Sequence, residues 1–210
     1  MSRIYEIFQR LSDHIPIPET ELKYTNPYTL LIAVVLSAQS TDKGVNKATD
    51  HLFKIVSTPQ DMVYLGLDKL KEHIKTIGLF NTKAKNIMAL SQKLIDEYNS
   101  IVPSTREELM RLPGVGRKTA NVVLNVVFNQ PTIPVDTHVA RVSNRLDLTT
   151  AIHPDKIEAE LEQIIPSIFL KSAHHLLILH GRYTCIARKP KCSNCILNDL
   201  CKYNLPHTTT

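Results

Sequence analysis

Residues 112–119 read Leu-Pro-Gly-Val-Gly-Arg-Lys-Thr and lie between two stretches of helical spacing. The Pro-Gly pair ends the first helix and Gly116 opens the second, which predicts a helix–hairpin–helix over about residues 105–127. Because glycine has no Cβ, this turn can bring backbone N–H groups up to an anion at the N-terminus of the second helix. The anion it suits is a nucleic-acid phosphate, and Gly114, Val115 and Gly116 are its expected contacts.

Two other interpretations of this turn need weighing. A nucleotide-binding P-loop requires glycine five residues before its second glycine, but that residue is Arg111 and no strand precedes the turn, so this interpretation fails. An ordinary helical hairpin that uses glycine only for its geometry stays open from the pattern alone. The complete Leu-Pro-Gly-Val-Gly string favours phosphate binding.

An amine and a carboxylate follow the turn. Lys118 lies in the first turn of the second helix, and no Asp or Glu occurs between Glu108 and Asp136. A helix-face lysine is usually only solvated, and Asp before a helix is a good N-cap, so each residue also has a structural interpretation. As a nucleophile Lys118 must lose its proton, which burial, the helix N-terminus and Arg117 all favour. A capping carboxylate is held rigidly, and we therefore expect Lys118 and Asp136 to be catalytic residues.

The composition is that of a globular protein with a mild preference for polyanions. The chain has 210 residues, of which 43% are hydrophobic and 21% charged, so it can bury one good core or two modest ones. The net charge of +5 favours a nucleic-acid partner, though only weakly on its own. The N-terminus is not a signal peptide, and the most apolar stretch, residues 28–38, is too short to cross a bilayer. We expect a cytoplasmic protein without membrane contact.

Nearly every segment shows helical spacing, and none shows a convincing run of strand alternation. Asn26 and Pro27 supply an N-cap and a first-turn proline to an almost wholly apolar helix, which should be buried at the centre of its domain. The clearest break is Gln-Pro-Thr-Ile-Pro at residues 130–134, a candidate domain crossing. We predict an all-α protein of about ten helices.

The cysteines cluster near the C-terminus in the pattern Cys-x6-Cys-x2-Cys-x5-Cys; they are Cys185, Cys192, Cys195 and Cys201. Clustered thiols in a reducing compartment indicate metal ligands rather than a disulfide framework. A zinc site usually has two Cys-x-x-Cys pairs, whereas this chain has one, so a single [4Fe–4S] cluster suits the spacing at least as well. The loop between Cys185 and Cys192 carries Arg188, Lys189 and Lys191 and no acid. It is either a second phosphate contact or a solvated basic loop.

Together these strings resemble the endonuclease III family, bifunctional DNA glycosylase/AP lyases of the helix–hairpin–helix superfamily. The resemblance covers nearly the whole chain. It rests on Leu-Leu-Ile-Ala-Val-Val-Leu-Ser-Ala-Gln at 30–39, Ile-Lys-Thr-Ile-Gly-Leu at 74–79, Leu-Pro-Gly-Val-Gly-Arg-Lys-Thr-Ala-Asn-Val-Val at 112–123, Val-Asp-Thr-His-Val at 135–139 and Leu-His-Gly-Arg-Tyr-Thr-Cys-Ile-Ala-Arg-Lys-Pro at 179–190. The cysteine spacing is the one this family uses for its [4Fe–4S] cluster.

The resemblance implies two helical domains with the active cleft between them. Residues 20–130 would form a six-helix barrel, and residues 1–19 with 131–210 would form the cluster domain, whose cluster loop is 185–201. Lys118 falls at the family's Schiff-base lysine and Asp136 at its catalytic aspartate. Gln39 matches the residue that fills the gap left by the extruded nucleotide, and Leu79 the one that wedges into the opposite strand.

The implied function is base-excision repair in a bacterial, nucleoid-associated protein that we expect to be monomeric. It would remove oxidised pyrimidines from duplex DNA through a lysine Schiff base and nick the strand 3′ to the abasic site. Two alternatives remain: a monofunctional glycosylase, and a non-catalytic or redox-sensing DNA-binding module. The first would be expected to lack a lysine at position 118, and the second to lose Lys118 or Asp136, yet both residues are present.

Overall fold

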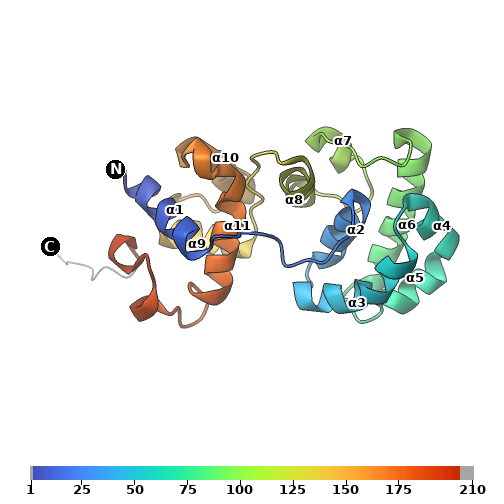
Figure 1. Cartoon of the computed structure of the whole chain (residues 1–210), viewed down its shortest axis with the longest axis horizontal. Helices are drawn as coiled ribbons and strands as arrows, with labels where there is room; N and C mark the ends of the chain where they lie inside the picture. Colours follow the sequence, from blue (N-terminus) through green and yellow to red (C-terminus); the bar gives the residue numbers. More distant parts are fainter. Residues whose placement is uncertain (1, 204–210) are drawn as a thin grey trace. The chain divides into compact units, whose positions relative to one another are not determined.

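The computed structural model describes residues 2–203; Met1 and residues 204–210, the two ends of the predicted cluster domain, lie outside the described part. The described residues form eleven α-helices and two 3₁₀ helices and contain no strand (Figure 1). The all-α prediction is confirmed. None of the helices in this part of the chain is both long and apolar enough to cross a membrane.

The chain divides into two compact units, residues 21–128 and residues 1–20 with 129–210. The first unit contains α2 (Pro27–Ser37), α3 (Asp42–Ile55), α4 (Pro59–Leu65), α5 (Leu67–Ile74), α6 (Phe80–Tyr98), α7 (Arg106–Met110) and α8 (Arg117–Phe128). The second contains α1 (Arg3–His14), α9 (Thr137–Arg145), α10 (Pro154–Ile164), α11 (Ser167–Tyr183), and the 3₁₀ helices η1 (Cys192–Asn194) and η2 (Asn198–Leu200).

The core of the 21–128 unit is built around α2. Asn26 caps this helix by accepting from the Thr29 backbone N–H at 2.9 Å, and the Thr29 hydroxyl accepts from the Asn26 N–H at 3.0 Å. Residues 28–36 are all buried, as the apolar run predicts. Helices α3, α6 and α8 pack against α2 (Figure 1). Helix α8, which follows the Gly116 turn, is therefore anchored on the buried helix at the centre of the unit.

In the other unit, α9 and α11 approach each other closely at Gly181. A Cβ at that position would lie 3.1 Å from the Cβ of His138 and 3.1 Å from Cγ2 of Val142. Such distances are shorter than most contacts of a Cβ, so any larger residue would require its neighbours to shift by a few tenths of an ångström. Helix α1 packs on α11 through aromatic contacts of Tyr5 and Phe8 with Phe169. The start of α9 and the end of α11 therefore belong to one packed body.

Candidate functional site

The hairpin forms as the sequence predicts. The Thr105 hydroxyl caps α7 by accepting from the Glu108 N–H at 3.3 Å, and it also contacts the Glu108 carboxylate at 2.7 Å. Two tight turns follow, with Leu112 N–H donating to Leu109 and Val115 N–H donating to Leu112, both at 3.1 Å. Helix α8 then begins behind Gly116, whose carbonyl accepts from the Ala120 N–H at 2.9 Å.

The two glycines of the hairpin have different roles. Gly114 has a φ of 79°, and a Cβ there would lie 3.0 Å from the side chain of Asn86, so both its conformation and its surroundings require glycine. A Cβ on Gly116 would meet nothing within 4 Å. The space beside the Gly116 Cα is thus open, and Gly116 is exposed just before α8 begins. The first N–H groups of a helix have no partner within the helix, and they are the groups that bind an anion at such a terminus.

Lys118 is exposed in the first turn of α8. Burial was expected to favour loss of its proton, and this expectation is wrong for the protein alone. The helix N-terminus and the neighbouring Arg117 are in place as expected.

Asp136 is the N-cap of α9, as predicted. Its Oδ1 accepts from the backbone N–H groups of His138 at 2.8 Å and Val139 at 2.9 Å. Its Oδ2 lies 3.2 Å from Nδ1 of His138, and the Asp136 side chain is 18% exposed. The carboxylate is therefore held at a fixed place by three contacts, and the helix N-terminus stabilises its negative charge. Lys118 belongs to the 21–128 unit and Asp136 to the other.

Gln39 and Leu79 both have left-handed backbone conformations. Gln39 follows the end of α2 with a φ of 55°, and Leu79 precedes α6 with a φ of 58°. Both side chains are exposed, Leu79 by 61%. The two segments are near each other, because a Cβ on Gly78 would lie 3.8 Å from the Gln39 carbonyl oxygen. The structure thus presents Gln39, the residue predicted to fill the gap, and Leu79, the residue predicted to wedge into the opposite strand, from adjacent segments of one unit. These two are called the wedge residues below.

All four cysteines line one pocket of about 350 Å³, open solvent included. Among residues 2–203, no three His, Cys, Asp or Glu side chains converge on a point that could hold one metal ion. Two N–H groups aim at sulfur: Arg145 Nη1 lies 3.4 Å from Cys185 Sγ, and the Leu197 backbone N–H donates to Cys195 Sγ at 3.4 Å. Burial raises the pKa of the Cys195 thiol. A pocket lined by four thiols and supported by N–H donors fits an iron–sulfur cluster.

The basic loop at the edge of this pocket is held by arginines of α9. Arg145 donates to the carbonyls of Ile186 and Ala187, both at 2.9 Å, and Arg141 donates to the carbonyl of Cys185 at 3.1 Å. With the backbone fixed, the three basic side chains of the loop are exposed; they are Arg188, Lys189 and Lys191. The loop is therefore a positively charged surface whose backbone is held from α9 at residues 185–187.

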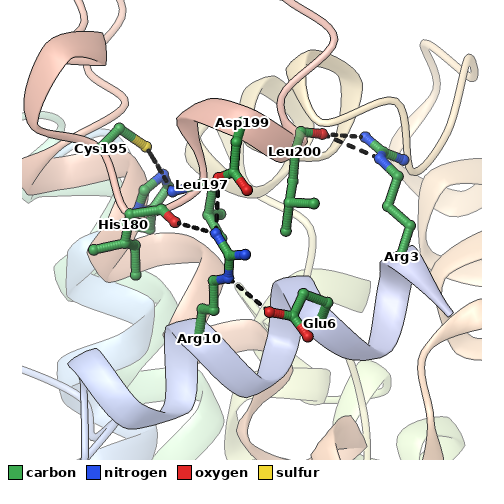
Figure 2. A network of polar contacts seen from close by, with 9 residues as sticks. Arg3, Glu6, Arg10, His180, Cys195, Leu197, Asp199 and Leu200 are labelled. Atoms are coloured by element: carbon green, nitrogen blue, oxygen red, sulfur yellow. Dashed lines mark hydrogen bonds and ion pairs between the residues drawn. The ribbon is translucent and has the colours of Figure 1, made fainter. Parts of the chain in front are cut away.

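Two arginines of α1 hold the end of the cluster loop (Figure 2). Arg10 Nη1 donates to the Asp199 carboxylate at 2.7 Å and to the Ile196 carbonyl at 3.1 Å. Arg3 donates to the Leu200 carbonyl at 2.9 and 3.1 Å and to the Leu146 carbonyl. Neither residue was predicted from the sequence. The available signal is their spacing: they are two helical turns apart and so share one face of α1.

We expect Arg3→Ala to lower the free energy of unfolding of the cluster-loaded protein by about 1–3 kcal/mol, because two partly buried carbonyls lose a charged donor. Urea denaturation followed by circular dichroism measures the change. Arg188→Ala removes an exposed arginine of the same unit and should leave the midpoint unchanged. Equal midpoints for the two variants would show that the α1 contacts do not stabilise the loop.

Family models and known proteins match most of the chain. Residues 32–167 match the model of the HhH-GPD superfamily base excision DNA repair proteins, and residues 185–201 match the iron–sulfur binding domain of endonuclease III. Endonuclease III of Haemophilus influenzae is 57% identical over 198 residues, 94% of each chain. Endonuclease III of Escherichia coli K12 is 52% identical over 94% of each chain.

A solved structure of a trapped endonuclease III–DNA covalent intermediate superimposes with a TM-score of 0.91 at 45% identity, covering 97% of each chain. The four clustered cysteines fall within the residues that match the iron–sulfur domain, so the chain carries the [4Fe–4S] cluster of these proteins. The chain belongs to the endonuclease III family, whose members are both DNA glycosylases and AP lyases, within the HhH-GPD superfamily of base excision DNA repair proteins.

Proposed function

We propose that Lys118 and Asp136 carry out the glycosylase and AP lyase reactions of the endonuclease III family in this chain. The substrate is duplex DNA that contains an oxidised pyrimidine or an abasic site. The observation that carries the proposal is the placement of Lys118, an exposed amine in the first turn of α8, directly behind the open backbone of Gly116. A relative with 45% identity has been trapped as a covalent intermediate with DNA.

Two surfaces of this chain would hold the phosphates. The first is the hairpin, where Gly114, Val115 and Gly116 lead into the N-terminus of α8. The second is the exposed basic loop between Cys185 and Cys192. Because both surfaces act on backbone charge, affinity should fall steeply as salt rises. Because its substrate is chromosomal DNA, we expect the protein to act on the nucleoid in the cytoplasm. We also expect it to act as a monomer.

Access to the sugar requires extrusion of the damaged nucleotide, which is easiest where pairing or stacking is already weakened. Gln39 would occupy the space that the nucleotide leaves, and Leu79 would wedge into the opposite strand. Their exposure and their position on adjacent segments of one unit support this assignment.

The reaction then takes place at C1′ of the extruded sugar. As the glycosidic bond breaks, C1′ gains oxocarbenium character, and the fixed carboxylate of Asp136 stabilises this charge. The neutral amine of Lys118 attacks C1′, the base leaves with the bonding electrons and is protonated, and the sugar ring opens to give an imine. Loss of a proton from C2′ followed by departure of the 3′ phosphate cuts the strand and completes β-elimination.

The four cysteines are the residues that would hold the cluster. When bound, the cluster supplies structural support rather than electrons, since no bond change in this reaction needs a redox step. This support would hold the basic loop in place, together with Arg145 of α9, which donates to the loop carbonyls of Ile186 and Ala187.

Borohydride trapping of the cluster-loaded protein on a duplex with one thymine glycol tests the proposal. A covalent complex whose modified peptide maps to Lys118 supports it. Release of the base without a trapped complex would instead establish a monofunctional glycosylase. Tight binding without either product would establish a DNA-binding module.

Gly116→Ala separates phosphate binding from folding. We expect the free energy of unfolding to change little, since the added methyl group meets nothing within 4 Å. Affinity for lesion-containing duplex should fall by about tenfold, because the methyl group blocks the approach of phosphate to backbone N–H groups. Fluorescence anisotropy at fixed salt measures the affinity.

Gly114→Ala is the matched comparison for this variant. It should destabilise the fold itself, because φ is 79° and Asn86 is in contact. Wild-type affinity of a folded Gly116→Ala protein would exclude the hairpin as a phosphate site.

A further inference from the structure

Lys83 is a buried lysine to which the reaction described above gives no role. It lies in the first turn of α6 and is only 5% exposed. Its ammonium donates to the Leu36 carbonyl at 2.9 Å and to the Ser40 hydroxyl at 3.0 Å. Both partners lie at the C-terminal end of α2 or just beyond it.

This arrangement is costly for the fold alone. An ammonium group loses much of its hydration when it is buried, and the recorded partners of Lys83 are neutral oxygens rather than a carboxylate. Burial accordingly lowers the pKa of Lys83. An apolar side chain of similar length would avoid this penalty, but it would leave the Leu36 carbonyl and the Ser40 hydroxyl without this donor. The contacts of the ammonium therefore indicate a role in fixing geometry.

The geometry that Lys83 fixes includes both predicted wedge residues. Its side chain holds Ser40, the residue that follows Gln39. Its backbone N–H donates to the Leu79 carbonyl at 3.0 Å, in the first turn of α6. One residue thus connects the segment of Gln39 with the segment of Leu79.

The backbone of both wedge residues needs such a connection. Gln39 and Leu79 have φ values of 55° and 58°, a region that residues with a Cβ rarely adopt. Conformations of this kind persist only where surrounding contacts determine them. The Lys83 ammonium restrains the Gln39 segment through Leu36 and Ser40, and the Lys83 backbone N–H holds the Leu79 carbonyl.

We propose that Lys83 is a positioning residue for base extrusion: it ties the Gln39 segment to the start of α6 and so sets how the two wedge side chains enter the DNA. The inference rests on the proposed function, because it assumes that Gln39 and Leu79 act on the DNA stack. It adds a residue that neither contacts the reacting atoms nor lies on the DNA-binding surfaces named above.

The test compares Lys83→Met with Lys85→Met, an exposed lysine two residues along the same helix. The cluster-loaded proteins are mixed with a duplex in which 2-aminopurine lies opposite one thymine glycol, and its fluorescence reports unstacking. Excision is followed in single turnover. β-Elimination is measured in parallel on a duplex with a preformed abasic site, where no damaged base has to be extruded.

We expect Lys83→Met to reduce the fluorescence rise and to slow excision of thymine glycol by about tenfold or more. β-Elimination at the preformed abasic site should change by less than about threefold, since the chemistry of Lys118 is intact. Lys85→Met should match the wild type in all three measurements. A purely structural role would slow both reactions equally, and that outcome would overturn the proposal, as would a wild-type fluorescence rise in folded Lys83→Met.

Ser40→Ala keeps the proposal testable if Lys83→Met does not fold. It removes one of the two acceptors of the Lys83 ammonium. It should slow excision of thymine glycol by about threefold and leave β-elimination at the preformed abasic site unchanged. Unchanged excision in both folded variants overturns the inference. Wild-type protein that is trapped on abasic DNA but gives no fluorescence rise would exclude the wedge assignment and this inference together, while the role of Lys118 would stand. A normal fluorescence rise without a trapped complex would exclude the role of Lys118, while the wedge assignment and this inference would stand.

Discussion

Lys118→Gln should give no borohydride-trapped complex and should lose AP lyase activity by at least about 10⁴-fold. Glutamine has no amine that can attack C1′, so residue 118 can no longer form the imine, and β-elimination through that imine cannot occur. Its helix propensity is close to that of lysine, and the side chain at 118 is exposed, so the fold should not change. Single-turnover strand cleavage on a duplex with one abasic site measures the loss.

DNA binding provides the control for this variant. The hairpin backbone and the basic loop are untouched, so affinity for the same duplex should stay within about tenfold of the wild type. Lys85→Gln, on an exposed position of α6, should cleave and trap like the wild type. A full yield of trapped complex with Lys118→Gln would assign the Schiff base to another amine.

Asp136→Asn should slow base excision by about 10²–10³-fold while leaving the fold nearly as stable as the wild type. Asparagine is as good an N-cap as aspartate, and its side-chain oxygen can accept from the same N–H groups of His138 and Val139. What the variant loses is the negative charge that stabilises C1′. Single-turnover excision of thymine glycol measures the rate, and thermal unfolding measures stability.

Asp136→Ala is the comparison that separates the two roles. It removes the charge and also the cap, so it should cost about 1 kcal/mol in the free energy of unfolding as well as activity. If Asp136→Asn excises the base at the wild-type rate, the carboxylate serves α9 alone and the catalytic charge must come from elsewhere.

Local signals in the sequence were sufficient for most of the fold. Asn26 and Asp136 each lie where an N-cap was predicted, because capping depends on residues within one helical turn. The hairpin was predictable for the same reason.

The supporting contacts of the sites depend on residues far apart in sequence. The sequence does not distinguish Gly114 from Gly116, because the difference comes from Asn86. Lys83 resembles a solvated lysine, although its position one turn before the buried Ile87 places it on the apolar face of α6. The partners of Arg3 are 143 and 197 residues away, and no local pattern identifies them.

The contact between Arg3 and Leu200 also constrains the order in which a newly made chain can fold. Residues 21–128 form a continuous unit that can fold as soon as it leaves the ribosome. Helix α1 is synthesised before this unit, yet its partner carbonyls in the cluster loop are synthesised after it. The hairpin can therefore be complete on the growing chain before α1 finds its place, because the partner carbonyls at residues 196 and 200 are made only after the hairpin.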